Sequence, residues 1–290
     1  MARKNTNSID VEVRNGVAIV WLNRPAVYNA LDERMTADLL QVLEEVESDR
    51  SLRALILAGR GEAFSAGGDI EWMQRMGQAS ASVNEKNALA ITRLFHALHT
   101  CSVPTIARVH GQCFGGGVGF VAACDIVVAS TDAEFACAEV KRGLVPAGIS
   151  PYVSRAIGAR NAQRYLLSGE RFDAAEAYRM GLVHEICQPD LIDNVVNALL
   201  GHLIAGSPAA QRTTKALLRG LNGAPIDEAL IRQSAKEMAK MRASAEAQEG
   251  MSAFLEKRDP AWIDGARGKT ARKKTPAKTA STKKGARAKR

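Results

Sequence analysis

Two glycine-rich segments carry the pattern with the clearest chemical meaning in this chain. Residues 63–70 read Ala-Phe-Ser-Ala-Gly-Gly-Asp-Ile, and residues 111–117 read Gly-Gln-Cys-Phe-Gly-Gly-Gly. Each lies between a predicted buried strand and the start of a predicted helix, where backbone N–H groups lack intrahelical partners and the helix dipole favours negative charge. Two such loops can direct two N–H groups at one oxygen, which is the geometry of an oxyanion hole. The alternative is that the glycines only form tight turns or helix–strand contacts.

A lone acid stands farther along, in an apolar stretch. Glu139 lies within Phe135–Val140, with Gly143 and Pro146 behind it. If its side chain faces a closed pocket, loss of hydration would raise its pKa and suit it to proton transfer. A solvated glutamate at the edge of a loop is the alternative.

A dinucleotide-binding pattern is present, but its context does not support it. Residues 117–122 match Gly-x-Gly-x-x-Ala, and Glu139 follows about twenty residues later, as such a site requires. The first glycine should follow its strand directly, yet Gly117 comes eight residues after Val109. The next helix would also end by Asp125, which is too short for a crossover helix. The match is therefore interpreted as accidental.

Other reactive side chains are assigned structural roles. His110 precedes the second glycine segment, and a lone histidine is more often a packed residue than a catalyst. Cys113 and Cys137 lie near the candidate residues in sequence, but no histidine partner is specified for a nucleophilic thiol. Asp69 is predicted to cap a helix, and Asp125 to open a strand. No His-Glu-x-x-His pattern or Cys/His cluster occurs, so no metal site is expected.

The sequence around these residues predicts β/α units followed by helices. Asn15-Gly16 joins two β-rich runs and predicts a hairpin. Residues 33–47 predict an amphipathic helix with Asp32 as its N-cap. The predicted strands are 9–13, 17–22, 54–57, 104–109 and 125–129. The further predicted helices are 83–99, 160–168, 173–180, 190–205, 208–221, 226–242 and 246–257. Other helices are expected to start near residue 69 and after the second glycine loop. An α/β fold closed by a helical section follows.

Composition indicates a soluble protein with one basic tail. The 290 residues are 46% hydrophobic, with no run as long as the ~18–20 apolar residues of a membrane span and no apolar leader at the start. A cytoplasmic location is therefore expected, with the five cysteines as free thiols. The net charge of +8 is misleading, because residues 267–290 hold eleven Lys/Arg and no acid, whereas the remainder has 28 basic and 31 acidic residues.

The tail after about residue 263 is rich in Lys, Ala and Thr and is expected to be disordered. It would either bind nucleic acid or another polyanion weakly and with steep salt dependence, or only add solubility.

Taken together, these segments resemble the enoyl-CoA hydratase/isomerase (crotonase) superfamily. The matching pieces are Leu22–Pro25, Asn29–Leu31, Ala63–Ile70, Gly115–Gly117, Ala123–Ile126, Glu139, Gly181–Val183 and Phe254–Arg258. They follow the family order from about residue 9 to 262. The resemblance implies a spiral of ββα units followed by helices that build a trimer, often a dimer of trimers. The divisions it implies are a flexible N-terminus (1–8), a spiral core with the acyl-CoA site (9–205), a helical oligomerisation section (206–262) and a disordered basic tail (263–290).

The resemblance also implies a site for acyl-CoA thioesters, with coenzyme A as part of the substrate and no separate cofactor. By motif position, the thioester oxygen would lie between the N–H groups of Gly68 and Gly116, and Glu139 would be the acid/base. The residues expected to line the CoA arm are Tyr28, Ala30, Ala66, Asp69, Ile70 and Glu71. Phe254 and Lys257 look like the family's contacts to the nucleotide of a neighbouring subunit.

One position departs from the family pattern. Two-glutamate hydratases carry an acid three residues after the oxyanion glycine, where this chain has Gly119. A single glutamate could still activate water and return its proton to C2. It could equally move a proton between C2 and C4, as in the family's Δ3,Δ2-enoyl-CoA isomerases. The acid pattern leaves both reactions open.

A finer likeness concerns residues 117–119, 139–146 and 149–153, which resemble the bacterial branch that hydrates methylglutaconyl-CoA and isohexenylglutaconyl-CoA. Those substrates carry an extra carboxylate. Lys141 or Arg142 would meet it, a hypothesis that depends only on their closeness to Glu139 in sequence. The alternative is that both side chains simply face solvent.

Overall fold

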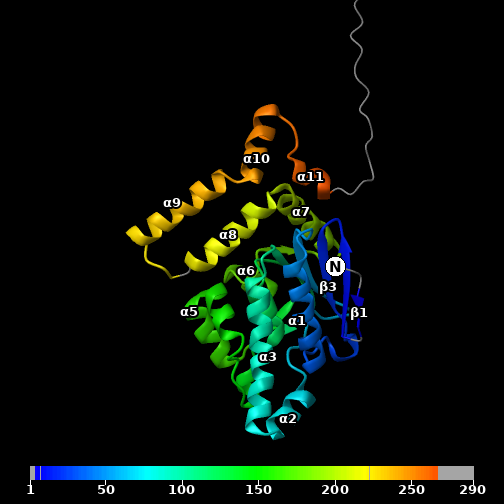
Figure 1. The fold of residues 1–290 in the computed structure, drawn as a ribbon. Helices are drawn as coiled ribbons and strands as arrows, with labels where there is room; N and C mark the ends of the chain where they lie inside the picture. Colours follow the sequence, from blue (N-terminus) through cyan, green and yellow to red (C-terminus); the bar gives the residue numbers. More distant parts are fainter. Residues whose placement is uncertain (1–3, 7, 222, 267–290) are drawn as a thin grey trace, which may run out of the picture.

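The computed structural model describes residues 4–6, 8–221 and 223–266 of the chain (Figure 1). The strands are β1 (Lys4–Asn5), β2 (Ile9–Arg14), β3 (Val17–Leu22), β4 (Ala54–Gly59), β5 (Thr105–Val109), β6 (Gln112–Phe114), β7 (Ile126–Ser130), β8 (Glu134–Ala136), β9 (Phe172–Asp173) and β10 (Glu185–Cys187). The α-helices are α1 (Glu33–Ser48), α2 (Ile70–Gln78), α3 (Ala81–Thr100), α4 (Gly116–Ala123), α5 (Ser150–Ser168), α6 (Ala174–Arg179), α7 (Ile192–Ala205), α8 (Pro208–Leu221), α9 (Glu228–Arg242), α10 (Ala245–Glu256) and α11 (Ala261–Ala266). The 3-10 turns are η1 (Pro25–Val27), η2 (Glu139–Arg142) and η3 (Pro189–Leu191).

A seven-stranded sheet, in the order β1-β2-β3-β4-β5-β7-β10, organises the first part of the chain. The predicted hairpin is confirmed, because β2 pairs with β3 in antiparallel register and Asn15 and Gly16 both have positive φ angles at the turn. From β3 to β10 every neighbouring pair is parallel. The carboxyl ends of β4 and β5, from which the two glycine loops leave, therefore lie side by side.

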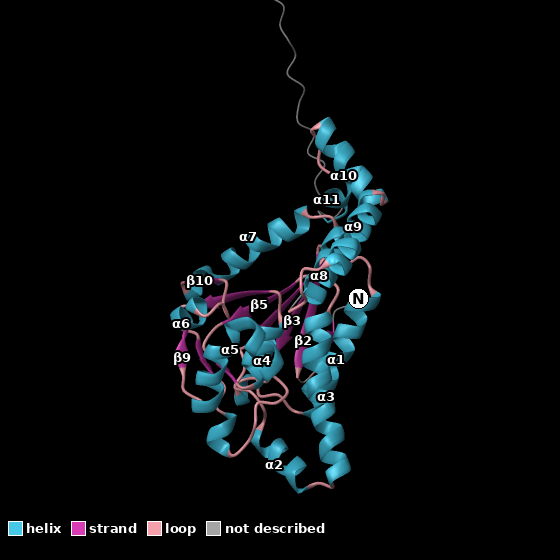
Figure 2. Cartoon of the chain, turned by 90° about the vertical axis from the view of Figure 1, so that its left-hand side faces the viewer, coloured by secondary structure: helices cyan, strands magenta, loops and turns pink. Residues whose placement is uncertain are grey.

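Helices cover both faces of this sheet (Figure 2). In β4, Leu55 and Leu57 point into a large apolar cluster that includes residues of α1 and α3. The alternate residues, Ala54 and Ile56, point into a smaller cluster beneath α7. A strand covered on both faces reads as a continuous apolar run rather than an alternating one, which is the pattern seen at 54–57.

The fold differs from the sequence prediction at several short strands, β10 of the main sheet among them, and at one helix. The short strands β6, β8 and β9 form a separate three-stranded sheet that was not predicted, because two or three residues show no usable periodicity. The helix predicted over 160–168 lies in α5, after the kink at Gly158, and the part of α5 from Ser150 to that kink was not predicted. Pro151 occupies its first turn and Gly158, with a φ of 75°, interrupts it, which masks the helical pattern before residue 160.

The C-terminal helices α9 and α10 lie beyond α8, at one end of the molecule (Figure 1). The predicted division at 205/206 falls between α7, which packs on the sheet, and α8. Within α10, Phe254 is 82% exposed. None of the described helices combines the length and apolar character needed to cross a membrane.

Both predicted ends of the chain contain regular structure. Within 1–8, β1 pairs with β2. The helix α11 crosses the predicted boundary at 263, and its Trp262 Nε1 donates to the Ala205 carbonyl (3.0 Å). The basic tail of residues 267–290, with its expected disorder and polyanion binding, lies outside the described residues.

Candidate active site

The first glycine loop, residues 59–68, is fixed by the buried amide of Asn29. Its Oδ1 accepts from the Arg24 N–H (2.8 Å), and its Nδ2 donates to the carbonyls of Arg60 and Ala63 (both 2.8 Å). Asn29 adopts a left-handed conformation with a φ of 56°, which asparagine tolerates better than most residues. One side chain thus joins the turn after η1 to the first half of the loop.

The direction of the Gly68 amide follows from the peptide before it. The Gly67 carbonyl accepts from the Leu31 N–H (2.7 Å). In a planar trans peptide the C=O and the following N–H point in opposite directions, so the Gly68 N–H points away from Leu31. Among the described residues, this N–H donates to no protein acceptor.

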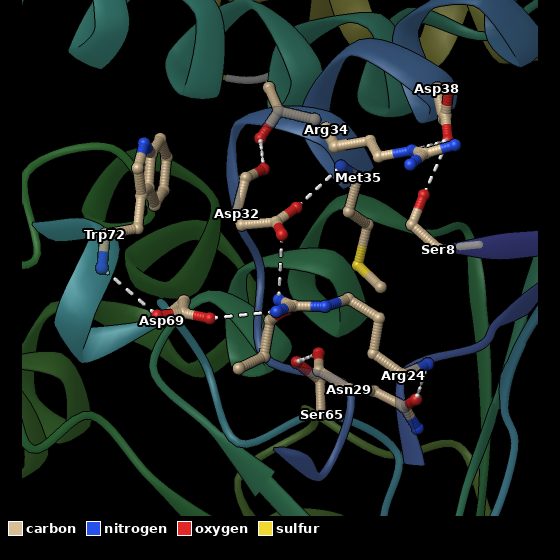
Figure 3. A network of polar contacts seen from close by, with 12 residues as sticks. Ser8, Arg24, Asn29, Asp32, Arg34, Met35, Asp38, Ser65, Asp69 and Trp72 are labelled. Carbon is tan, nitrogen blue, oxygen red and sulfur yellow. Dashed lines mark hydrogen bonds and ion pairs between the residues drawn. The ribbon is translucent and has the colours of Figure 1, made fainter. Parts of the chain in front are cut away.

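Side-chain caps hold the helix that follows this loop (Figure 3). The Asp69 Oδ1 accepts from the Trp72 N–H (3.1 Å), which confirms the predicted cap of α2. The Arg24 guanidinium pairs with Asp69 (3.0 Å) and with Asp32 (3.2 Å), the N-cap of α1. Burial raises the pKa of Asp69, but the Trp72 amide and Arg24 outweigh it and hold that pKa below its usual value.

Backbone hydrogen bonds join the second glycine loop to the first. The Phe64 N–H donates to the His110 carbonyl (2.9 Å), the Ser65 N–H donates to the Gln112 carbonyl (3.0 Å), and the Phe114 N–H donates to the Ser65 carbonyl (2.8 Å). The two loops are therefore one paired unit, and the distance between their ends is set by the backbone.

The second loop ends at Gly116, the first residue of α4. The Gly115 carbonyl accepts from the Gly119 N–H (3.1 Å) inside the helix, so the Gly116 N–H points out of its N-terminus. It too lacks an acceptor within the described ranges. A Cβ on Gly67 would lie 3.4 Å from the Gly115 Cα, which brings the two loop ends together. Two neighbouring, unpaired amides suit an oxygen that gains negative charge.

Glu139 begins η2 and packs against the second loop. Its Oε1 lies 3.0 Å from the position that a Cβ on Gly115 would take, so a side chain there would displace the carboxylate. The Glu139 Oε2 is buried and has no hydrogen-bond partner among the described residues. Burial raises the pKa of Glu139, while its own backbone and the Arg142 charge lower it to a smaller extent. A carboxylate with this environment is suited to taking and returning a proton.

A cavity of about 860 Å³ brings most of the predicted residues together. Those that line it are Ala30, Ala66, Gly68, Asp69, Ile70, Glu71, Glu139, Lys141 and Arg142. The wall also includes Arg24, Val27, Met73, Phe114, Leu144 and Arg171, which the sequence did not single out as site residues. Asp69 and Glu71 are the acids of the wall besides Glu139. Arg171 pairs with Glu134 (2.9 Å) and lies over the Phe114 ring.

Four predicted residues are not part of the cavity wall. Gly116 follows Gly115, which does line the cavity, and the Tyr28 carbonyl accepts from the Ala66 N–H (2.8 Å) while the Tyr28 side chain is half exposed. Phe254 lines a separate apolar groove, and Lys257 ends α10 in a left-handed conformation. The contacts expected for Phe254 and Lys257 involve a second subunit, so they stay a prediction.

The position that departs from the family pattern has no room for an acid. A Cβ on Gly119 would lie 2.3 Å from the Ile149 Cγ2 and 2.9 Å from the Phe95 ring. Aliphatic and aromatic side chains therefore occupy the space where a second carboxylate would begin.

The remaining candidates have structural contacts. His110 is half-buried, and its Nε2 lies 2.8 Å from the Gly61 carbonyl. Burial raises the pKa of both Cys113 and Cys137, which disfavours the thiolate that a nucleophile needs. Asp125 accepts from the Thr105 backbone N–H (2.8 Å) and pairs with Lys215 of α8 (2.5 Å).

No metal cluster accompanies this site in the part of the chain that the structure describes. Groups of three or more His, Cys, Asp or Glu side chains that could hold an ion are absent there.

Comparisons with known proteins agree on one family. The family model for enoyl-CoA hydratase/isomerase matches residues 12–265. The short-chain-enoyl-CoA hydratase of Clostridium acetobutylicum is 32% identical over 87% of this chain and 96% of its own length. The mitochondrial Delta(3,5)-Delta(2,4)-dienoyl-CoA isomerase of Dictyostelium discoideum is 30% identical over 84% of this chain and 86% of its own.

The fold is shared with solved structures. The crystal structure of an enoyl-CoA hydratase from Shewanella pealeana superposes with a TM-score of 0.85 and 38% identity, covering 88% of this chain and 96% of that one. The predicted α/β spiral with C-terminal helices is thereby confirmed.

Proposed function

This chain belongs to the enoyl-CoA hydratase/isomerase family, and on that premise we propose that it adds water across the α,β double bond of an enoyl-CoA thioester. The observation that carries this proposal is one arrangement: two unpaired glycine amides at adjacent loop ends, and the buried, unpaired Glu139 Oε2 beside them. Hydratases and an isomerase both occur among the relatives.

The two amides would act on the thioester carbonyl. Its oxygen would accept from the Gly68 and Gly116 N–H groups, which stabilise the enolate oxygen as charge develops. Removing one such donor from other enzymes costs about 10²–10³ in kcat. Since the loops are joined by backbone hydrogen bonds, little reorganisation would accompany the reaction.

Glu139 would carry out both transfers of one proton. Its carboxylate takes a proton from water as the water oxygen bonds to C3, and the double-bond electrons shift to the thioester oxygen. The protonated Glu139 then gives that proton to C2 as the enolate collapses, so one water molecule is added in all. The burial that raises the pKa of Glu139 makes its carboxylate a stronger base and so favours the first step.

An isomerase that uses the same three residues is the second candidate. It is favoured by the apolar filling around Gly119, which excludes the second carboxylate of a two-glutamate hydratase. In this reaction Glu139 would take a proton from C2 of a 3-enoyl-CoA and return it to C4. The oxyanion contacts would be unchanged.

A steady-state ultraviolet assay separates the two reactions. A hydratase removes the conjugated enoyl-thioester absorbance of crotonyl-CoA, and we expect this loss. An isomerase would leave crotonyl-CoA unchanged and would generate the same absorbance from a 3-enoyl-CoA. No change with either substrate would contradict both candidates.

We further propose that the acyl group carries a carboxylate, as in 3-methylglutaconyl-CoA. The support is that the cations Lys141, Arg142 and Arg171 line the cavity that holds Glu139. The Lys141 stem packs on Gly169, and the Arg142 Nη1 reaches the Ala138 carbonyl (3.4 Å), so both side chains stay close to the cavity wall.

Alanine variants of Lys141 and Arg142 test this specificity. We expect each to raise KM for 3-methylglutaconyl-CoA about tenfold relative to crotonyl-CoA, as loss of a charged contact of about 1.4 kcal/mol would. Arg160→Ala, which removes an exposed arginine on α5, is the control. An unchanged ratio for both site variants would mean that they only face solvent.

We also propose that the C-terminal section assembles the chain into a trimer. Phe254 and Leu255 of α10 are 82% and 79% exposed, and large apolar side chains that gather on a surface are typical of interfaces. Light scattering after size exclusion should give three times the chain mass, and Phe254→Asp should lower it. A monomeric wild type would contradict the proposal.

A further inference from the structure

Ser65 is the residue at which the two glycine loops and the Asn29 turn meet. Its side chain is fully buried and is not part of the cavity wall. Its backbone N–H and carbonyl bond the second loop, at Gln112 and Phe114. Its hydroxyl faces the Asn29 backbone, a contact visible in Figure 3.

The Ser65 hydroxyl makes one hydrogen bond as donor and one as acceptor. It donates to the Asn29 carbonyl (2.9 Å), and it accepts from the Gly67 N–H (3.2 Å). A serine hydroxyl can do both at once, whereas an alanine methyl can do neither. Without it, a buried carbonyl and a buried N–H would both lose their partner.

Gly67 is consequently held on both sides. Its N–H is fixed by the Ser65 Oγ, and its carbonyl is fixed by the Leu31 N–H. Its φ of 93° is a conformation that only glycine adopts readily, and a Cβ there would lie 2.8 Å from the Phe114 carbonyl oxygen. The two fixed peptide planes determine where the Gly68 N–H points.

We propose that Ser65 is a positioning residue for the oxyanion hole, because its hydroxyl holds the Gly67 peptide and thereby aims the Gly68 N–H. This inference rests on the proposed function, in which that N–H binds the thioester oxygen. Ser65 itself touches no substrate. Without its hydroxyl, Gly67 keeps only the Leu31 contact, and the Gly68 amide can rotate away from the oxygen.

The matched variants are Ser65→Ala, Ser65→Cys and Ser130→Ala. Ser130 is also fully buried, and its hydroxyl faces the Asp132 carboxylate and the Val109 carbonyl (3.4 Å), but it lies at the end of β7 and outside the cavity wall. We expect Ser65→Ala to lower kcat for crotonyl-CoA hydration about 10–100-fold, since a misplacement near 1 Å can cost that much. KM should change less than about threefold, because Asn29 keeps its side-chain hydrogen bonds.

A spectroscopic readout separates positioning from general loss of structure. A cinnamoyl-type CoA thioester that is not turned over should absorb at longer wavelength when its carbonyl is polarised by two N–H donors. We expect the wild type and Ser130→Ala to produce the full shift, Ser65→Ala to produce less than half of it, and Ser65→Cys to be intermediate, because a thiol is a weak donor and acceptor.

The possible outcomes are distinct. If Ser65→Ala keeps the full shift and the kcat of Ser130→Ala, the inference is wrong. If Ser65→Ala does not fold, Ser65→Cys decides in the same way, with a wild-type shift and kcat as the contradicting result. If the wild type produces the shift but does not hydrate enoyl-CoAs, the proposed hydratase function fails while the shift still tests Ser65. If the wild type produces no shift, both the proposed function and the positioning role of Ser65 are contradicted.

Discussion

The first glycine loop leads into α2, whose N-terminus is capped by the Asp69 side chain and braced by Arg24. The second leads into α4, whose N-cap Gly115 makes no side-chain hydrogen bond. There close contacts constrain the backbone in addition to its hydrogen bonds: a Cβ on Gly117 would lie 2.8 Å from the Ser65 carbonyl oxygen. Each loop supplies one amide. Polar side chains hold the first loop in place, whereas the second loop depends on glycines at positions where a Cβ would clash with its neighbours.

This difference predicts opposite sensitivities. Deleting a polar group should damage the first loop, because each side-chain contact there satisfies a specific backbone group. Adding a methyl group should damage the second loop, because its neighbours are backbone and packed core atoms that cannot move aside cheaply.

The largest expected effect is on the second loop. Gly117→Ala should destabilise the protein by about 2 kcal/mol, since the clash with the Ser65 backbone outweighs the better helix propensity of alanine. Gly68→Ala should cost less than about 1 kcal/mol, because its Cβ would meet only the end of the flexible Met73 side chain, with Sδ at 3.0 Å. Urea unfolding measures both, and equal losses would contradict the comparison.

Removing the cap of the first loop should have the next largest effect. Asp69→Ala should lower the free energy of unfolding by about 1 kcal/mol and lower kcat about tenfold through disturbed positioning. Ser80→Ala removes the cap of α3, which lies outside the cavity wall, and is the control. Ser80→Ala should lower the free energy of unfolding by a similar amount with no change in kcat. If kcat fell equally in both variants, reduced stability alone would explain the loss of activity.

A smaller effect on stability is expected at Glu139. Its pKa is raised in the folded protein, so the ionised form destabilises the fold above the pKa of an unfolded glutamate, and stability is lost as pH rises through the folded value. Glu139→Gln should therefore be slightly more stable than the wild type at pH 8. The difference should shrink toward pH 4. A less stable variant at pH 8 would show that the carboxylate has a compensating partner.

The smallest expected effect is a shift of a pH profile. Arg142 lowers the pKa of Glu139, against the larger effect of burial. Arg142→Ala should move the acid limb of kcat/KM for crotonyl-CoA to higher pH, because the base form of Glu139 is required. At pH 8 the change should stay below about threefold, as is typical of a screened, exposed charge. An acid limb that stays in place would mean that Glu139 does not control it.

Much of the fold could be predicted because its signals are local. Asn15-Gly16 allows the hairpin turn, and Asp32 and Asp69 cap the helices that were expected to follow them. The second sheet could not be predicted, because β6, β8 and β9 are defined by partners distant in sequence. The early start of α5 was hidden by Gly158.

Prediction of the site from the sequence has the same limit. The two glycine segments and Glu139 stand out as residue types, and the family resemblance assigned them roles. The filling of the space at Gly119 by Ile149 and Phe95 comes from tertiary packing and has no local signal. The buried hydroxyl of Ser65 reads as one small polar residue in a loop, because its partners Asn29 and Gly67 are recognisable only in three dimensions.

Glu139 alone is assigned both proton transfers, while the two loops hold the thioester. The most direct test compares wild type and Glu139→Gln in the steady-state hydration of crotonyl-CoA, with binding of the substrate measured separately. We expect kcat to fall about 10³-fold or more, since one residue serves as both base and acid, with affinity for the thioester changed less than about threefold. A variant that keeps more than a tenth of the wild-type kcat would contradict it.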